Sequence, residues 1–145
     1  MRWADSNARC RFTMKDNEQY AYFAVADGFD PADITARVGV QPTDSWRRGD
    51  QCVQTLRERQ FSRWSLHSRL DRKQELELHI RDVLAQLDAN AEAFASVSRE
   101  FGGWMQLVAY LRRDDPGLRF EPDIVEGLAR YALAVDFDIY RLYER

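Results

Sequence analysis

The segment SWRRGD carries residues that could bind an anion. Trp46 offers a ring face, and Arg47 and Arg48 offer guanidinium groups that pair with a nucleotide phosphate or an acidic protein patch. A structural interpretation competes, because Gly49 adopts turn conformations that other residues resist and Asp50 caps a turn through its own side chain. We favour the structural interpretation, in which Trp46 covers the sheet. The segment also lacks the spaced glycines and the Lys-Ser/Thr ending of a phosphate-binding loop.

A second candidate lies near the end of the chain, in ALAVDFDIYRLY. Its residues alternate, so Asp136, Asp138 and Tyr140 share one face of a predicted strand, and Phe137 and Ile139 share the other, which we expect to be buried. Two carboxylates on one face could bind a divalent cation or share a proton. A metal site would need further ligands that converge on the same spot. Acids on the solvated face of an edge strand also prevent aggregation, and we favour that interpretation.

The remaining chemically reactive residues form no motif. His67 and His79 fall on different predicted elements, and we expect each at the surface or at the boundary of the core. Cys10 and Cys52 form no CxxC pair, which predicts free, half-buried thiols in a reducing compartment. No serine or cysteine stands in a nucleophile-elbow context. The sequence therefore predicts no catalytic residue, no metal and no cofactor. An enzyme that uses the Asp136/Asp138 face or the turn from Trp46 to Asp50 remains an alternative.

Charge is distributed unevenly along the chain. The formal net charge is −3, but residues 37–73 hold nine basic and four acidic residues, and residues 74–145 hold eight basic and fourteen acidic residues. The arginines of residues 47–72 interleave with Trp46, Phe61 and Trp64, a mixture that nucleic-acid-binding proteins use. The negative net charge and the carboxylates among these arginines argue against nucleic-acid binding, which we keep as an alternative. A protein partner fits the polarised charge better.

Hydrophobic periodicity predicts the elements in order. Two strands form a hairpin across KDNEQ, a helix begins at Asp30-Pro31 and ends at Gly39, and a strand after the turn PTDSWRRGD pairs with the next across RERQ. Two helices follow, the first with a capping box from Asp71 to Gln74 and the second with Asn90 as its N-cap. The predicted strands are 9–14, 20–26, 51–56, 61–68, 104–113, 118–120 and 132–143. Two predicted helices span 30–38 and 90–101. A third begins at Asp71 and continues at least to Leu87, and a fourth begins at Glu121 and continues at least to Leu128.

The stretch FDPADI is nearly repeated as FEPDIV, at Phe29 and Phe120. In each copy an acidic residue precedes a proline that suits the first helical turn. The sequence predicts a single α+β domain over residues 1–145. It is a two-layer sandwich with a mixed, mainly antiparallel sheet, helices mostly on one face and a possible duplication of βαβ-type halves. The sequence contains no run of about 18 apolar residues, so we expect no membrane span. No secretory signal is visible either, which favours the cytoplasm.

The chain resembles a bacterial family known as domain of unknown function 4279. The resemblance covers residues 20–140 and leaves residues 1–18 as an N-terminal extension or first hairpin arm. The specific pieces are Pro42-Thr43 with Gly49-Asp50, Trp64-Ser65-Leu66 and the ending from Asp136 to Tyr140. The resemblance implies a small α+β protein and supplies no activity, cofactor or catalytic residue. We expect a non-catalytic cytoplasmic binding protein. An immunity or regulatory role is an analogy with other small families.

Overall fold

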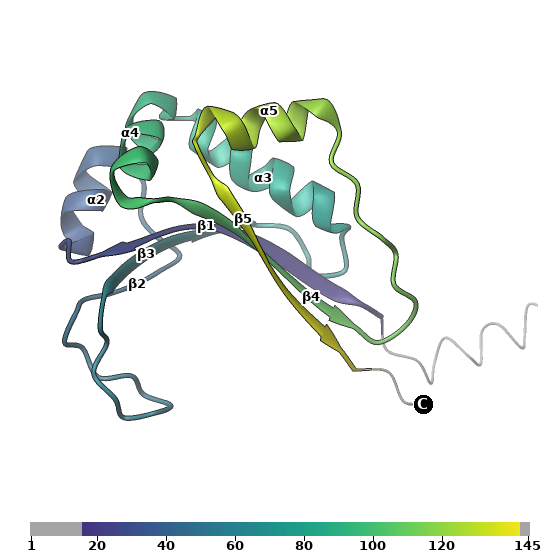
Figure 1. The fold of residues 1–145 in the computed structure, drawn as a ribbon, viewed down its shortest axis with the longest axis horizontal. Helices are drawn as coiled ribbons and strands as arrows, with labels where there is room; N and C mark the ends of the chain where they lie inside the picture. Colours follow the sequence, from purple (N-terminus) through teal and green to yellow (C-terminus); the bar gives the residue numbers. More distant parts are fainter. Residues whose placement is uncertain (1–15, 143–145) are drawn as a thin grey trace, which may run out of the picture.

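In the computed structural model, which describes residues 16–142, four helices lie on one side of a five-stranded sheet (Figure 1). This arrangement confirms the predicted α+β fold. The strands are β1 (Glu18–Asp27), β2 (Asp44–Trp46), β3 (Ser62–His67), β4 (Trp104–Leu111) and β5 (Ala134–Arg141). The helices are α2 (Pro31–Val38), α3 (Leu76–Asp88), α4 (Ala91–Phe101) and α5 (Pro122–Arg130). The predicted strand over residues 9–14 lies outside the described residues.

The strand order is β2-β3-β1-β4-β5, so β1 lies at the centre of the sheet. β1 pairs antiparallel with β3 and with β4, and β2 pairs antiparallel with β3. β5 pairs parallel with β4 and forms one edge. The sheet is therefore mixed and mainly antiparallel, as predicted. Within residues 16–142, no helix is long and apolar enough to cross a membrane.

The first predicted helix corner is confirmed in detail. Asp30 accepts a hydrogen bond from Ala32 N through its side chain, and Pro31 occupies the first turn of α2. Gly39 ends the helix in the left-handed region with φ of 70°, a conformation that glycine adopts without a steric penalty. These local interactions explain why FDPADI encodes a helix start.

The second corner uses the same proline but a weaker cap. Pro122 begins α5, and the side chain of Glu121 makes no capping hydrogen bond. α5 connects β4 to its parallel neighbour β5, whereas α2 connects β1 to β2 with β3 between them. Both helices therefore join strands that run in the same direction, and the duplication remains a prediction.

The hydrophobic core lies between the helices and one face of the sheet. Its largest fully buried side chains include Trp64 of β3, Phe23 of β1 and Phe94 of α4, whose rings meet edge-on or tilted at centroid distances of 5.6 to 6.2 Å. The apolar stripe of α3 belongs to this core or packs against it: Leu76, Ile80, Val83, Leu84 and Leu87. Trp64 and Leu66 of β3 both face inward.

The partner of β3 differs from the prediction. Residues 51–56 form no strand and make only an isolated bridge between Gln51 and Glu58. Val53 is 86% exposed and Leu56 has φ of 58°, so the segment neither packs nor keeps an extended backbone. On the side away from β1, the strand that pairs with β3 is instead β2, inside the predicted turn PTDSWRRGD.

Three local predictions are also wrong. α3 begins at Leu76 rather than Asp71, because Asp71 caps a separate turn by accepting a hydrogen bond from Lys73 N. The side chain of Asn90, at the start of α4, makes no cap and donates instead to Val38 O. Residues 118–120 form no strand, since they belong to a loop that leaves β4 and leads to α5.

β5 is an edge strand, as predicted, but the helices do not fully cover its apolar face. Phe137 and Ile139 point to the helix side of the sheet and remain 44% and 53% exposed. α5 covers only the beginning of β5, and the strand then extends beyond the helix layer (Figure 1). The expected burial of these two side chains is therefore wrong, and they line a hollow described below.

Candidate functional site

The sheet face opposite the helices carries aromatic and arginine side chains. The pleat places the residues that alternate with the core residues on this side. We define the aromatic-arginine face by eight side chains from β1 to β4 and the adjoining loops: Tyr20, Tyr22, Trp46, Arg59, Arg63, His67, Arg72 and Trp104. This side of the sheet faces away from the helices and is the arched underside of the sheet in Figure 1.

Arg63 lies at the centre of this face. Its guanidinium carbon is 4.9 Å from the ring centroid of Tyr22, 5.1 Å from that of Trp46 and 5.6 Å from that of Trp104. Its Nε atom is buried and has no hydrogen-bond partner among the described residues. A buried donor without a partner costs about 1–3 kcal/mol, so this arginine is poorly satisfied in the isolated chain.

Two further arginines stack on rings of the same face. Arg59 lies 3.8 Å from the centroid of Trp46, and Arg72 lies 4.5 Å from that of Tyr20. Among residues 16–142, neither these two guanidinium groups nor that of Arg63 forms an ion pair with a carboxylate. The face therefore presents three cations that are held in place by rings, and their charges remain available to an anionic partner.

Tyr22 and His67 occupy directly opposite positions on β1 and β3, and their rings stack at 4.6 Å. Tyr20 stacks on both, with centroids 6.2 Å from Tyr22 and 5.7 Å from His67. Burial lowers the pKa of His67, and the nearby Arg63 and Arg72 lower it further, against an opposing effect of Asp44. The neutral imidazole is thus favoured. The faces of these three rings are therefore in contact with one another.

The turn that follows β2 has the structural role that we favoured. Asp50 accepts a hydrogen bond from Arg47 N at 2.8 Å, and Gly49 has φ of 92°. The side chain of Arg47 pairs with Asp30 at 3.1 Å, which ties the turn to the start of α2. Arg48 N donates to Ser62 Oγ at 2.9 Å. Trp46 Nε1 donates to Phe61 O, so the indole lies against the sheet and contributes to the aromatic-arginine face.

The acidic candidates lie on β5, at the opposite edge of the same sheet face. Asp138 accepts a hydrogen bond from Gln106 Nε2 at 3.2 Å, and Gln106 Oε1 accepts one from Trp104 Nε1 at 3.0 Å. Asp136 accepts from the neighbouring backbone amide, and the ring of Tyr140 stacks on that of Tyr110 at 5.1 Å. Asp138 is therefore linked through two polar contacts to the aromatic-arginine face.

The structure does not unite the two predicted groups in one pocket. Trp46, Arg47 and Asp50 line a small cavity of about 340 Å³ near α2, and neither Asp136 nor Asp138 reaches it. No group of three or more potential metal ligands occurs in residues 16–142. A polar pocket shared by both groups would have supported the enzyme alternative, and no such pocket is present in the described part of the chain.

His79 is fully buried, which corrects the expected surface or boundary position. Its Nδ1 lies 2.6 Å from Ser68 Oγ, and its Nε2 has no described partner. Burial lowers the pKa of His79, with Asp71 and Asp82 acting in the opposite direction. An active Ser-His pair needs an exposed nucleophile and a group that orients the imidazole. Here Ser68 is half-buried, and no described group forms a hydrogen bond with His79 Nε2. The helical spacing predicted His79 at the boundary of the core. That prediction failed because a histidine that makes a polar contact can occupy a core position.

Sequence reasoning did not identify Tyr20, Tyr22 and Trp104 as site residues, and it considered Arg63 only among the arginines of the nucleic-acid alternative. A signal was present, because Tyr20 and Tyr22 alternate with core residues and Arg63 alternates with Trp64 and Leu66. Both patterns were used only to assign strands. The convergence of Arg63 with Trp104 depends on the order β3-β1-β4, which a single sequence does not reveal.

Comparison with known proteins places the chain in one family. The model of the family described as "Domain of unknown function (DUF4279)" matches residues 17–142. The match covers most of the chain, which therefore belongs to this family, as the resemblance indicated. No curated protein and no solved structure matches the chain.

Proposed function

We propose that this member of the DUF4279 family is a non-catalytic binding protein whose aromatic-arginine face takes up an acidic segment of a partner protein. The observation that carries the proposal is Arg63, a cation among three rings with a buried Nε that lacks a described partner. A partner carboxylate would satisfy this arginine. A guanidinium that rings already hold in place loses less entropy when it pairs with such an anion.

The composition of the face also supports a protein partner. Trp, Tyr and Arg are the residues that contribute most binding energy at protein interfaces, especially where neighbouring contacts exclude water. Arg59 and Arg72 add positive charge on the side of β3 and β1, while Asp136 and Asp138 add negative charge at the β5 edge. A partner with an acidic segment next to a basic or polar one would bind in a single orientation, because the reversed orientation brings like charges together.

Nucleic acid is the weaker alternative for the same face. Binding of single strands needs free ring faces on which bases stack. Here Tyr20, Tyr22 and His67 stack on one another, and guanidinium groups cover Trp46 and Tyr20. The carboxylates on β5 would also repel a phosphate backbone that crossed the whole face.

The test compares the proteins captured from a native lysate by three immobilised versions of the full chain. Arg63→Glu reverses the central charge. Val125→Glu is the matched control, because Val125 is 51% exposed on α5, on the other side of the sheet. We expect at least one protein to be retained by the wild type and by the Val125→Glu variant and lost from the Arg63→Glu variant. Circular dichroism establishes that all three are folded.

Two outcomes contradict the proposal. Identical captured proteins for all three versions would show that the aromatic-arginine face is not used. Loss of the captured proteins after nuclease treatment, together with a salt-dependent gel shift of an oligonucleotide by the wild type alone, would instead support nucleic-acid binding. A partner whose capture depends on Arg63 can then be tested as a purified protein by calorimetry, with the Arg63→Lys variant to measure the contribution of bidentate pairing.

An immunity or regulatory role in the cytoplasm would be one use of such a face. It predicts that the partner is a toxin or an enzyme with an acidic surface. A toxin-like reading frame immediately upstream of the coding sequence would favour it, and the purified toxin would then be inhibited by the wild type and not by the Arg63→Glu variant.

A further inference from the structure

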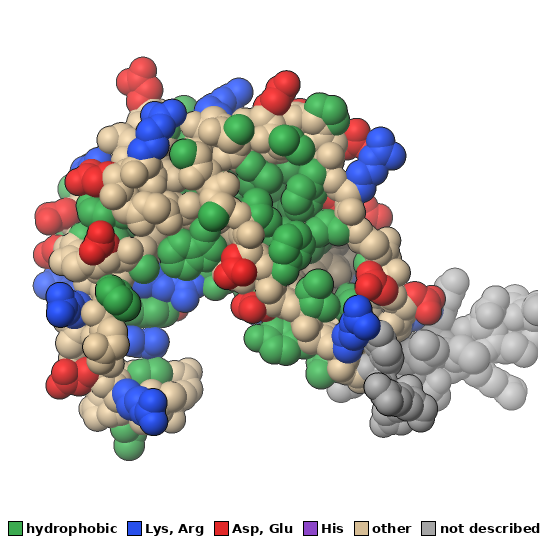
Figure 2. Space-filling model, in the orientation of Figure 1, with side chains coloured by type: hydrophobic (Ala, Val, Ile, Leu, Met, Phe, Trp, Pro, Cys, Tyr) green, Lys and Arg blue, Asp and Glu red, His purple; other side chains and the backbone are tan. Residues whose placement is uncertain are grey.

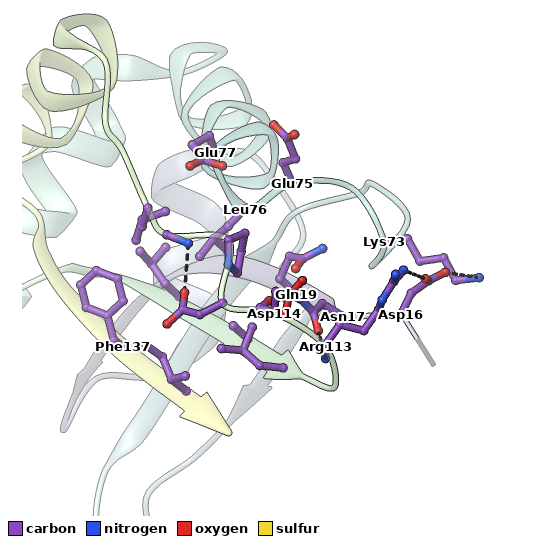
Figure 3. Close-up of a pocket in the computed structure, with 18 of the residues that line it drawn as sticks. Asp16, Asn17, Gln19, Lys73, Glu75, Leu76, Glu77, Arg113, Asp114 and Phe137 are labelled. Carbon is purple, nitrogen blue, oxygen red and sulfur yellow. Dashed lines mark hydrogen bonds and ion pairs between the residues drawn. The ribbon is translucent and has the colours of Figure 1, made fainter. Parts of the chain in front are cut away.

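A hollow of about 900 Å³ lies on the helix side of the sheet, where the helices leave the ends of β4 and β5 uncovered. Its walls are the start of α3, the two strands and the loop of residues 112–121 (Figure 3). In Figure 2, apolar side chains gather in the hollowed region beneath α5 and beside β5. Its volume is within the range of about 300–1,000 Å³ that is usual for sites that bind small organic molecules.

The floor of the hollow is apolar and partly open to solvent. Leu107 and Leu111 of β4 form its buried part, and Phe137, Ile139 and Leu118 contribute side chains that are 44%, 53% and 39% exposed. Contiguous exposed apolar surface of this kind usually marks a binding site in a folded protein. A ligand with an apolar body would remove these side chains from water, which contributes about 25 cal/mol for each Å² covered.

The rim of the hollow is acidic. Five carboxylates line it, against the two cations Lys73 and Arg113. Both cations pair with Asp16, at 3.9 and 3.3 Å, and this one carboxylate offsets one of their two charges (Figure 3). Arg141 compensates a second carboxylate, that of Asp115, at 3.8 Å.

Three rim carboxylates remain, those of Glu75, Glu77 and Asp114. None of them forms an ion pair within residues 16–142. Glu75 and Glu77 flank Leu76 at the start of α3, and Asp114 lies in the loop across from them (Figure 3). Glu77 accepts one hydrogen bond, from Arg119 N at 3.3 Å, and keeps its charge uncompensated. The apolar floor and the three carboxylates therefore favour the same kind of ligand, one that combines an apolar body with a positive charge.

We propose that this hollow binds a small organic cation, with its apolar body on Leu107, Phe137 and Ile139 and its ammonium group at the rim. The site is separate from the aromatic-arginine face, on the opposite side of the sheet, and does not depend on the function proposed for that face. Charge complementarity selects the cation, since the same apolar body with a carboxylate would bring like charges together at the rim.

The test uses three probes with the same apolar body and different head groups: 3-phenylpropylamine, 3-phenylpropanol and 4-phenylbutyrate. Amide chemical shifts of the full chain are followed by NMR during titration with each probe. We expect the amine to shift the amides of residues 107–111 and 137–139, with a Kd at least about fivefold below that of the carboxylate probe. The alcohol should bind with an intermediate affinity. The preference for the amine should decrease at high salt, because the rim is exposed.

Two pairs of variants separate the rim from the floor. The double variant Glu75→Gln/Asp114→Asn should reduce the preference for the amine, while Glu126→Gln, on the exposed surface of α5, should leave it unchanged. Ile139→Lys places a cation in the floor and should abolish amine binding. Val125→Lys is its matched control, because Val125 is exposed to a similar extent, 51% against 53%, outside the hollow.

Three results would overturn this inference. The first is the absence of amine-induced shifts in residues 107–111 and 137–139. The second is carboxylate binding that equals or exceeds amine binding. The third is a shift of the same amides with protein concentration alone, which would show that a second copy of the chain occupies the hollow. The Arg63→Glu variant should bind the amine like the wild type, so the two proposals can fail independently.

Discussion

The indole Nε1 of Trp64 donates a hydrogen bond of 3.0 Å to Thr35 Oγ1, which joins the buried face of β3 to α2. The Thr35 hydroxyl in turn lies 3.3 Å from Pro31 O and donates to it. Trp64 is fully buried and Thr35 is half-buried, so this hydrogen bond lies at the boundary of the core. The short helix α2 is thereby tied to the sheet by a polar contact as well as by its apolar side chains.

Replacement of Thr35 by Val preserves the shape of the side chain and removes the acceptor. We expect the free energy of unfolding to fall by about 1–3 kcal/mol, because the buried indole N–H is left without a partner. Urea denaturation followed by tryptophan fluorescence measures the change. Thr35→Ser keeps the hydroxyl and should lose clearly less. Equal losses in the two variants would show that packing of the methyl group, and not the hydrogen bond, stabilises this contact.

Gly102 and Gly103 are adjacent, and the structure assigns them different roles. Gly102 has φ of 66°, and a Cβ added there would meet no atom within 4 Å. A Cβ on Gly103 would instead lie 2.9 Å from Ser98 Cβ and 3.1 Å from Phe23 Cε2. Gly102→Ala should cost about 1 kcal/mol through backbone strain, and Gly102→Asn should cost less, because Asn tolerates the left-handed region. Gly103→Ala should cost about 1–3 kcal/mol through overpacking.

Thermal unfolding distinguishes the two causes at these glycines. At position 102 the Asn variant should lose less stability than the Ala variant. At position 103 the Asn variant should lose more, since only this site lacks space for a side chain. The same order of stability at both positions would contradict the separation of strain from packing.

The two histidines predict how stability depends on pH. Burial lowers the pKa of both His67 and His79 below the ordinary value of 6.5. When the pH falls below this unfolded-state value, the unfolded chain takes up protons that the folded chain does not. The free energy of unfolding should therefore be at its full value above about pH 6.5 and should decrease as the pH falls below it, until the folded histidines titrate.

Urea denaturation at several pH values between about 7 and about 5 measures this slope. The single variants His67→Gln and His79→Gln should each reduce it, and the double variant should nearly remove it. The carboxyl of Asp82 should contribute only at lower pH, because its pKa is lowered below 3.8 by its hydrogen bonds to Arg69, which outweigh the opposing effect of burial. A slope that persists in the double variant would contradict the assignment.

Cys52 is the one cysteine in the described residues, and it is free. Hydrogen bonds from the Thr55 side chain, and from the Thr55 and Gln54 backbone, lower the pKa of its thiol to about 7. The rate of alkylation by iodoacetamide in a Cys10→Ser background should rise with pH around an inflection near this value. Thr55→Ala should move the inflection upward. An inflection at the ordinary value for a thiol in both proteins would contradict this account.

Local interactions explain which parts of the fold could be predicted from the sequence. The start and end of α2 depend on Asp30, Pro31 and Gly39, which act on their immediate neighbours. The alternation of Trp64 and Leu66 with polar residues likewise identifies the buried face of β3 without knowledge of its partners. The pairing of β2 with β3 could not be predicted, because Val53 and Leu56 suggested a strand closer in the sequence as the partner of β3. In the structure these two residues lie in an exposed loop, which excludes that pairing.

The candidate sites show the same limit. Trp46 and Asp138 were identified as residues with useful chemistry, but the structure places them at opposite edges of the sheet. Arg63 becomes a site residue only because β1 and β4 bring Tyr22 and Trp104 beside it. The hollow could not be predicted either, since the pattern of Phe137 and Ile139 predicts burial and does not show where α5 ends.

The central position of β1 has a consequence for synthesis on the ribosome. β1 is the first described strand to emerge, and its neighbour β4 pairs Tyr110 with Glu18, so the middle of the sheet cannot close until most of the chain has been translated. Until then one edge of β1 stays open, with Tyr20 and Tyr22 unshielded, and could pair with other nascent chains. Slow, late closure of this kind predicts that the growing polypeptide depends on chaperones that hold unfinished chains apart.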